Sequence, residues 1–324
     1  MSTAKFFGGA RVTIRHFQPG DEAAQIAIYN AVAGALPKFK PATLQEVQRR
    51  TRARDHDPSL RFYAEESGQV VGYCTVQPNG RVSYPWCPPG HEHNAGPLFE
   101  QALATLRQRG VKRAFCAYRG DWPAINQLFL DHGFRPAREM VSFVMNFLDM
   151  PTPAARHTSA ISPVTDSDLP AILDFGAGVL RVSTPEALRK HLFSNPYFRA
   201  EALFALRSRQ NAAPLAIGIV IDEATYADPR VLDANMPCFR LGAFGTEGMT
   251  TKRVKGLFSF LARQDRTLPA LGMDVLGYAA NLLRVDDDLE CFASQVPSDA
   301  PALLAFYQRH FQRQGSFPVL ERDL

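Results

Sequence analysis

The sequence predicts an α+β protein of two tandem units, each with a mixed but mostly antiparallel central sheet flanked by helices. Segments 118–134 and 296–317 both run from a strand end through an Asp-containing turn into an apolar-faced helix, which is followed by Gly and Phe. Segments 14–21 and 161–168 have equal lengths, and each leads from a strand into a helix. The two halves therefore start alike and end alike, which indicates an internal repeat.

The length of 324 residues agrees with two units, because a domain typically holds about 150 residues. No apolar run approaches the roughly 20 residues of a membrane span, and segment 1–17 has no signal-like stretch. The five cysteines stand singly in apolar surroundings, which indicates reduced and buried thiols. A net charge of only +4 gives little reason to expect nucleic acid. We therefore expect a cytoplasmic protein that binds neither membranes nor nucleic acid.

Hydrophobic periodicity and turn residues give the element order of the first half. The expected elements are a strand over 12–17, helices over 22–33 and 43–54, a hairpin over 60–65 and 69–77, a strand over 81–86, a helix over 98–109, a strand over 112–118, a helix after Pro123 and a strand over 138–147. Segment 149–158 contains two prolines and small residues, as interdomain linkers do. We expect a first domain over 1–148 and a second over 159–324.

The second half repeats this order. The expected elements are a strand over 160–163, helices over 169–180 and 185–193, a hairpin over 202–207 and 214–221, a strand over 237–244, a helix that begins near 252, a helix over 271–284, a strand over 289–296 and a helix from Pro301 to Gly315.

Segment 242–261 is a candidate anion site. It combines glycines with Lys252, Arg253 and Lys255 at an expected helix start. Unpaired N–H groups at a helix N-terminus, with basic neighbours, suit a pyrophosphate. The alternative is a loop whose lysines are merely solvated. In the first half, His91 and His93 stand in a Pro/Gly loop without a third ligand, so a solvated turn competes with a metal site and we expect no metal.

Tyr307 is the candidate catalytic hydroxyl. The spacing of Leu303, Leu304 and Tyr307 places all three on the inner face of the last helix. The first copy has Phe129 at the same position. Tyr307 therefore either donates a proton or only fills the core, as Phe129 must.

The element order of each half resembles the GCN5-related N-acetyltransferase (GNAT) superfamily, duplicated in tandem. That family has a loop of the form Arg/Gln-x-x-Gly-x-Gly/Ala after its fourth strand. Segment 251–256 (TKRVKG) keeps the last small residue, Gly256, and segment 90–95 keeps only Ala95. Both loops are thus partly degenerate, and the resemblance implies coenzyme A binding by the second half and a degenerate first domain.

The family's last helix reads Val-x-x-x-Asn-x-x-Ala, then Tyr, then Gly-Phe, and its Tyr serves as general acid to the leaving thiolate. Val296 and Tyr307 match in register, Ala300 stands at the Asn position, and Gly315 comes later than usual. The resemblance implies Tyr307 as general acid.

Two further sets of site residues follow from the resemblance. Glu247, beyond the expected fourth strand, and His191, on an early helix, are weak candidates for the base that takes the amine proton. The expected cofactor-binding residues are the main-chain groups of Leu241, Gly242, Ala243 and Phe244, the loop residues Thr251, Lys252, Arg253, Val254, Lys255 and Gly256, and Asp299 before the last helix.

The resemblance thus predicts an N-acyltransferase that moves an acetyl group from acetyl-CoA to a small-molecule or peptide amine, without a metal, in the second domain. Two alternatives stay open. One is a non-catalytic protein on the same scaffold that binds acyl-CoA or a partner. The other is a transferase that uses aminoacyl-tRNA, which the weak net charge disfavours. The sequence leaves open the acceptor, the acyl chain length and the oligomeric state.

Overall fold

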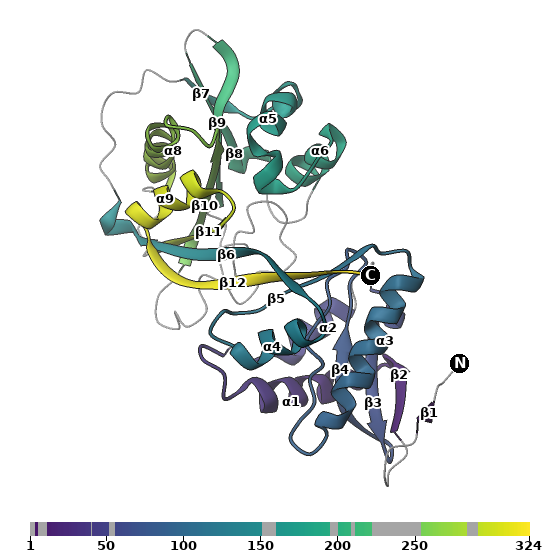
Figure 1. The fold of residues 1–324 in the computed structure, drawn as a ribbon. Coiled ribbons are helices and arrows are strands. Elements are labelled where there is room, and N and C mark those ends of the chain that lie inside the picture. The colour runs from purple at the N-terminus through teal and green to yellow at the C-terminus, as the bar shows by residue number, and fades with distance from the viewer. Residues whose placement is uncertain are drawn as a thin grey trace. The chain divides into compact units, whose positions relative to one another are not determined.

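The chain forms two compact units in a computed structural model, and each is described by itself (Figure 1). The first contains Met1–Ala137 and Pro318–Leu324, and the second contains Arg138–Phe317. The structure describes residues 4–5, 12–39, 41–51, 56–150, 160–194, 200–208, 211–221, 254–283 and 291–324.

The first unit is built on an antiparallel sheet of order β1-β2-β3-β4. The extended segment 81–86 adds to β4 through bridges from Val82 to Val76 and from Trp86 to Tyr73. The elements are β1 (Ala4–Lys5), β2 (Val12–His16), α1 (Asp21–Ala33), α2 (Leu44–Thr51), β3 (Arg61–Glu66), β4 (Gln69–Thr75), α3 (Ala95–Gln108), β5 (Arg113–Ala117) and α4 (Pro123–Asp131).

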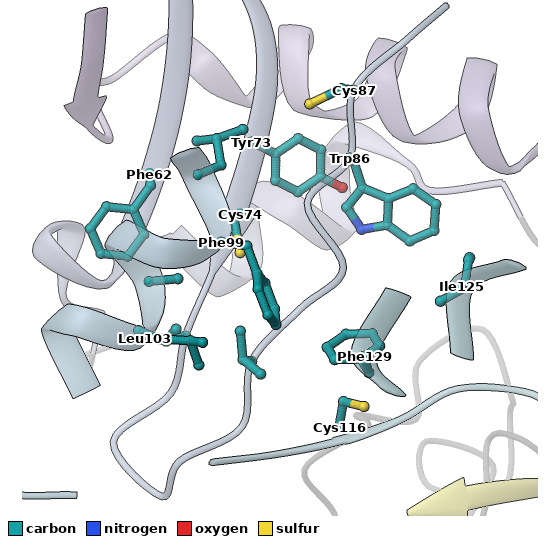
Figure 2. Close-up of a cluster of buried hydrophobic side chains, with 14 of the residues drawn as sticks. Phe62, Tyr73, Cys74, Trp86, Cys87, Phe99, Leu103, Cys116, Ile125 and Phe129 are labelled. Carbon is teal, nitrogen blue, oxygen red and sulfur yellow. The ribbon is translucent and has the colours of Figure 1, made fainter. Parts of the chain in front are cut away.

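The core of the first unit lies between this sheet and its helices (Figure 2). Phe99 of α3 and Phe129 of α4 are fully buried, with ring centroids 5.4 Å apart. Cys74 and Cys116 are buried beside them. Burial in apolar surroundings raises the pKa of Cys74 to about 12, so this thiol stays protonated. This agrees with the expectation of reduced, buried cysteines.

The second unit has a mixed sheet of order β12-β6-β11-β10-β9-β8-β7. Its two faces carry separate cores: α8 and α9 cover one face, and α5 and α6 cover the other. The elements are β6 (Arg135–Asn146), β7 (Ala160–Pro163), α5 (Leu169–Leu180), α6 (Pro185–Phe193), β8 (Leu203–Ser208), β9 (Asn211–Ile221), β10 (Val254–Ala262), α8 (Leu268–Leu283), β11 (Cys291–Pro297), α9 (Pro301–His310) and β12 (Gln312–Asp323).

The corner that opens each half is built the same way. Asp21 is buried, accepts the N–H of Gln18 at 2.7 Å and pairs with Arg15 at 2.8 Å. In the second unit, Asp168 is buried, accepts the N–H of Thr165 at 2.8 Å and pairs with Arg207 at 2.8 Å. A buried carboxylate is stable there because each is paired and hydrogen-bonded. The equal lengths of segments 14–21 and 161–168 therefore reflect one repeated corner.

The closing strands exchange between the units. β6 follows the first half of the sequence, but residues 140–146 pair with β11 in the second unit, from Met140↔Pro297 to Asn146↔Cys291. The end of the chain pairs with β5 in the first unit, from Val319↔Ala117 to Asp323↔Arg113. The expected boundaries, 1–148 and 159–324, assume that each half keeps its own last strand. The units of the structure differ from them in these two segments.

Most expected elements are present, with two errors near the candidate site. Segment 254–262 is the strand β10, where a helix start was expected, and the helix after it begins only at Leu268. The last helix ends at His310, and Gly315 lies inside β12. The expected strand 237–244 and most of the expected linker lie outside the described residues. None of the described helices has the length and apolarity to cross a bilayer.

Candidate active site

The second unit contains a fork between two parallel strands. β10 and β11 pair in parallel from Val254↔Cys291 to Leu257↔Ala293. Beyond Leu257, β10 stays paired with β9 as far as Ala262, and β11 stays paired with β6 as far as Pro297. The two strands therefore part after their last mutual pair, and main-chain groups on their facing edges can receive an extended ligand.

Two buried polar side chains stand where the fork opens. Ser294 and Gln295 directly follow Ala293, and they are 1% and 3% exposed. Gln295 Nε2 lies 3.3 Å from Oγ of Ser142, the residue opposite it on β6. Ser294 Oγ and Gln295 Oε1 have no hydrogen-bond partner among the residues that the structure describes. A buried polar atom without a partner is costly, so these two atoms mark the fork as a candidate binding site.

Tyr307 lies on the α8/α9 side of this fork. Its side chain is fully buried, and its ring centroid is 5.7 Å from that of Phe143 on β6 and 5.8 Å from that of Phe260 on β10. These strands flank β11, so Tyr307 lies over the strand that carries Ser294. The sequence correctly predicted that Tyr307 faces inward. Whether its hydroxyl donates a proton stays a prediction.

Gly272 of α8 allows this aromatic cluster to close. A Cβ at this position would lie 2.7 Å from Phe306 and 2.8 Å from Phe260, both closer than ordinary contact. Phe306 and Phe260 have ring centroids 4.9 Å apart, edge to face. The glycine thus sets the distance between α8 and the rings around Tyr307.

The turn that leads from β10 into α8 carries an acid, Asp265, just before the helix begins at Leu268. Asp265 Oδ1 accepts the N–H of Thr267 at 2.8 Å and its hydroxyl at 2.6 Å. These hydrogen bonds lower the pKa of Asp265. Arg263 and Arg266 flank it at the surface, and Arg263 forms an ion pair with Asp174 of α5. An anion at the start of α8 would therefore meet a carboxylate together with arginines.

A glutamine links the end of β10 to the start of α9. Gln264 Nε2 donates to the carbonyl of Ala262 at 3.3 Å, and its Oε1 accepts the N–H of Leu303 at 3.2 Å. Leu303 lies in the first turn of α9, where N–H groups lack partners within the helix. The exposed Gln264 side chain thus extends from the end of β10 to the start of α9.

A charged group lies beyond the end of β11. Asp299 Oδ1 lies 3.6 Å from Arg138 Nη1, and its Oδ2 lies 4.0 Å from Arg181 Nη2. Arg138 also donates to the carbonyl of Val179 at 3.4 Å. Asp299, an expected cofactor-binding residue, therefore pairs with basic side chains near the end of α5.

The other expected site residues fall in two groups. Val254, Lys255 and Gly256 form the first part of β10, so their expected placement at a helix start is wrong. The failure has a physical cause, because their backbone pairs with β11. Outside the described residues lie Leu241, Gly242, Ala243, Phe244, Glu247, Thr251, Lys252 and Arg253. Of His191, the structure describes only its place in α6.

Sequence reasoning missed Ser294, Gln295 and Ser142. A signal was present, since Ser294 and Gln295 interrupt the otherwise apolar run 291–296 of a strand expected to be buried. Polar residues in such a run need partners or a ligand. Nothing comparable in the sequence singled out Ser142 as a site residue, because a serine within the alternating pattern of 138–147 is common.

The matching fork in the first unit is closed by one side chain. The extended segment 81–86 meets β5 at the parallel bridge Arg81↔Phe115. Tyr118, just after β5, accepts the N–H of Tyr84 at its hydroxyl at 2.6 Å. Burial raises the pKa of Tyr118, so it stays a neutral phenol. This hydroxyl therefore spans the gap between the two strands.

The loop before α3 is held by a carboxylate. Glu66 accepts hydrogen bonds at its Oε1 from Asn94 at 2.8 Å and, at 2.9 Å, pairs with His93 Nε2. Its Oε2 lies 3.0 Å from His91 Nδ1. The first unit thus places an acidic group against the loop that was expected to be degenerate. Among the described residues, no group of His, Cys, Asp or Glu has the arrangement of a metal site.

The two units and their forks define the class of fold to which the chain belongs. It is the fold of tandem GNAT proteins, as two solved structures show. A GCN5-related N-acetyltransferase from Sphaerobacter thermophilus is similar over 96% of this chain and 95% of its own, with a TM-score of 0.62 and 14% sequence identity. A tandem GNAT protein from the clavulanic acid biosynthesis pathway is similar over 96% of this chain and 98% of its own, with a TM-score of 0.54 and 11% identity. Identities this low establish the fold alone. No family model matches the sequence, and no curated protein matches it.

Proposed function

We propose that the protein is an N-acyltransferase that moves an acetyl group from acetyl-CoA to an amine, with the chemistry in the second unit. One observation carries the proposal: β10 and β11 part beside the buried Tyr307, with Ser294 and Gln295 at the point of parting. The fold of tandem GNAT proteins supports the same class of reaction. We keep the expectation that the protein works in the cytoplasm without a metal.

The reaction needs few groups from the protein. The amine lone pair attacks the thioester carbonyl, a C–N bond forms, and the C–S bond breaks. In the proposal, Tyr307 donates its proton to the departing sulfur, and a base or an ordered water takes the amine proton. Main-chain N–H groups on the free edge of β10 stabilise the oxygen that gains negative charge. The same role was expected for the main chain of residues 241–244, which lie outside the described residues, and it stays a prediction for them.

Binding of the coenzyme is tested first. Isothermal titration of the full chain with acetyl-CoA should give a saturable signal, and the triple variant with Lys252, Arg253 and Lys255 changed to Glu should bind more weakly. Binding that survives this variant would remove residues 251–256 from the site. No binding at millimolar acetyl-CoA would refute the function.

A non-catalytic acyl-CoA-binding or partner-binding protein is the second candidate. Two observations favour it: the carboxylate of Asp265 in the turn before α8 and the complete burial of Tyr307. Thiol release from acetyl-CoA, measured with amino acids, polyamines, aminoglycosides and peptides as acceptors, separates the candidates. Binding without thiol release from any acceptor supports the second.

A further inference from the structure

We propose that the buried pair Gln295 and Ser142 positions the amine acceptor, with Gln295 Oε1 accepting a hydrogen bond from the amine N–H. The inference rests on the proposed function and names a specificity-determining contact for it. Gln295 Nε2 donates a hydrogen bond to Ser142 Oγ at 3.3 Å. Gln295 Oε1 is buried and has no partner in the described part of the chain.

The geometry places this oxygen at the fork. Gln295 is the second residue after Ala293, which forms the last pair with β10. Its backbone continues in the ladder with β6, opposite Ser142, so the side chain is anchored by a regular strand. A polar side chain that is 3% exposed and held at one end by a neighbour has little freedom to turn toward water.

The chemistry of Gln295 Oε1 determines which kind of ligand group it can bind. An amide oxygen accepts hydrogen bonds and donates none, so it is complementary to an N–H group. Two sources of N–H enter a transferase of this kind: the amine acceptor and the amides of the pantetheine arm of acetyl-CoA. The amine acceptor is favoured over the pantetheine amides, because Gln295 and Tyr307 lie on opposite faces of the sheet.

Strand alternation separates the two chemical groups. Gln295 shares its face of β11 with Ala293, and Ser142 shares its face of β6 with Val144. Ala293 and Val144 belong to the core under α5 and α6, whereas Tyr307 belongs to the core under α8 and α9. An amine held by Gln295 would thus approach the thioester from the face opposite the proposed acid. Nucleophile and leaving group then meet different side chains.

The first test is the stability of the free protein. The double variant Ser142→Ala with Gln295→Met removes both partners and keeps apolar groups of similar size. Replacing a buried polar pair in this way is neutral or stabilising when one of its atoms is unsatisfied. We expect a Tm equal to that of the wild type or higher by about 2 °C. A Tm lower by about 4 °C or more, or a variant that does not fold, would make the pair structural and overturn the proposal.

The second test separates the two sources of N–H. L-lysine, spermidine and glycylglycine serve as acceptor probes at saturating acetyl-CoA. In Gln295→Met we expect kcat/KM for the best of these amines to fall about 10-fold or more, while the Kd for acetyl-CoA changes less than twofold. An equal loss in acetyl-CoA affinity would assign the contact to the pantetheine amide and overturn the amine assignment.

Gln295→Glu is the matched control, because its side chain has the same length and keeps an oxygen at the position of Gln295 Oε1. It should retain kcat/KM for the amine within about threefold, since a carboxylate also accepts from an amine. Loss of activity equal to that of Gln295→Met would contradict an acceptor role for this atom. If the wild type releases no thiol from acetyl-CoA with these probes or with the wider panel of amino acids, polyamines, aminoglycosides and peptides, the proposed function fails. In that case, calorimetric titration with spermidine tests the contact alone, and equal affinities of wild type and Gln295→Met overturn it.

Discussion

The forks of the two units differ in what fills them. In the first unit, the Tyr118 hydroxyl accepts the N–H of Tyr84 at 2.6 Å and so occupies the main-chain edge that parts from β5. The sequence repeat places Val296 at the position of Tyr118, and a valine cannot make such a bond. In the second unit, Gln264 instead links the end of β10 to the start of α9, beyond the fork. The first fork is thus bridged by a side chain of its own core, whereas no such bridge joins β10 and β11 among the residues that the structure describes.

The next positions along the repeat differ in the same sense. Cys116 corresponds to Ser294 and Ala117 corresponds to Gln295. The buried Cys116 is one of the apolar core residues of the first unit (Figure 2), whereas its counterpart presents a hydroxyl. The fork of the second unit thus carries buried polar groups, whereas the corresponding positions of the first unit hold apolar residues or a tyrosine that is hydrogen-bonded within its own unit.

The largest effect is expected at the aromatic position of the last helix. Tyr307→Phe copies the residue of the first unit, Phe129, and removes the proposed proton donor. A general acid typically contributes 10²–10⁴-fold, so kcat should fall by about 100-fold or more while acetyl-CoA affinity stays the same. Steady-state kinetics with calorimetry checks this. Unchanged turnover would remove Tyr307 from the mechanism.

The reverse exchange serves as the matched variant. Phe129→Tyr places a hydroxyl among Phe99 and Phe134, whose ring centroids are 5.4 Å and 5.3 Å from that of Phe129. It should lower stability by about 1–3 kcal/mol, because a hydroxyl would be buried without a partner, and it should add no activity. Turnover gained by this variant would show that the first fork is functional.

The closure of the first fork is tested at Tyr118. Tyr118→Phe keeps the ring but leaves the Tyr84 N–H without its acceptor, which should lower the free energy of unfolding by about 1 kcal/mol. Urea denaturation measures this. Acetyl-CoA affinity should not change, because the second unit carries the proposed site. A changed affinity would place coenzyme binding in the first unit.

A smaller effect is expected at the start of α8. Asp265→Asn keeps an oxygen that can accept from Thr267 but removes a negative charge at the start of α8, the first described helix after the expected phosphate-binding residues 251–256. Charges near a helix terminus contribute about 0.3–1 kcal/mol, so acetyl-CoA should bind about two- to fivefold more tightly. Asp166→Asn, which removes a surface charge paired with Arg189, is the control. Equal affinities for wild type and Asp265→Asn would exclude the start of α8 as the phosphate site.

The smallest effect is a pH dependence in the first unit. Hydrogen bonding from Asn94, with the charges of His91 and His93, lowers the pKa of Glu66. Its stabilising contribution is therefore complete above the unfolded-state pKa, about 4.3, and is lost as the pH falls through the lower folded value. Glu66→Gln should lose less stability than the wild type between pH 7 and pH 3, as measured by urea midpoints. Glu92→Gln, whose native carboxylate accepts the N–H of Gly90, is the control. An equal pH dependence of Glu66→Gln and wild type would contradict a stabilising role for the contacts of Glu66 with Asn94, His91 and His93.

The fold could be predicted because its signals are local. Alternation and turn residues located the hairpins over 61–75 and 203–221, and Pro and Thr located the start of α6 at Pro185. Equal segment lengths revealed the repeated corners at Asp21 and Asp168. Each hairpin, the start of α6 and each corner is determined by a few residues that are adjacent in the sequence.

The site was harder to predict because its position depends on pairing at long range. The glycine and basic residues at 252–256 are typical of a phosphate loop, but β11 provides a partner for the backbone of 254–257, and strand pairing overrides the local pattern. Ser142 and Gln295 lie 153 positions apart, so no local pattern joins them. The burial of Tyr307 could be predicted because helical spacing determines which face of the helix it lies on. That Phe143 and Phe260 are its neighbours could not be predicted, because they lie on strands far away in the sequence.

Residues 319–323 pair with β5 in the first unit. Arg113 of β5 thus lies opposite a residue 210 positions further along the chain. A contact so distant in sequence slows folding. A fragment ending at residue 148 should expose the edge of β5 and aggregate, and a peptide of residues 312–324 supplied in trans should restore its solubility. Deleting residues 318–324 would thus damage the unit that residues 1–137 form.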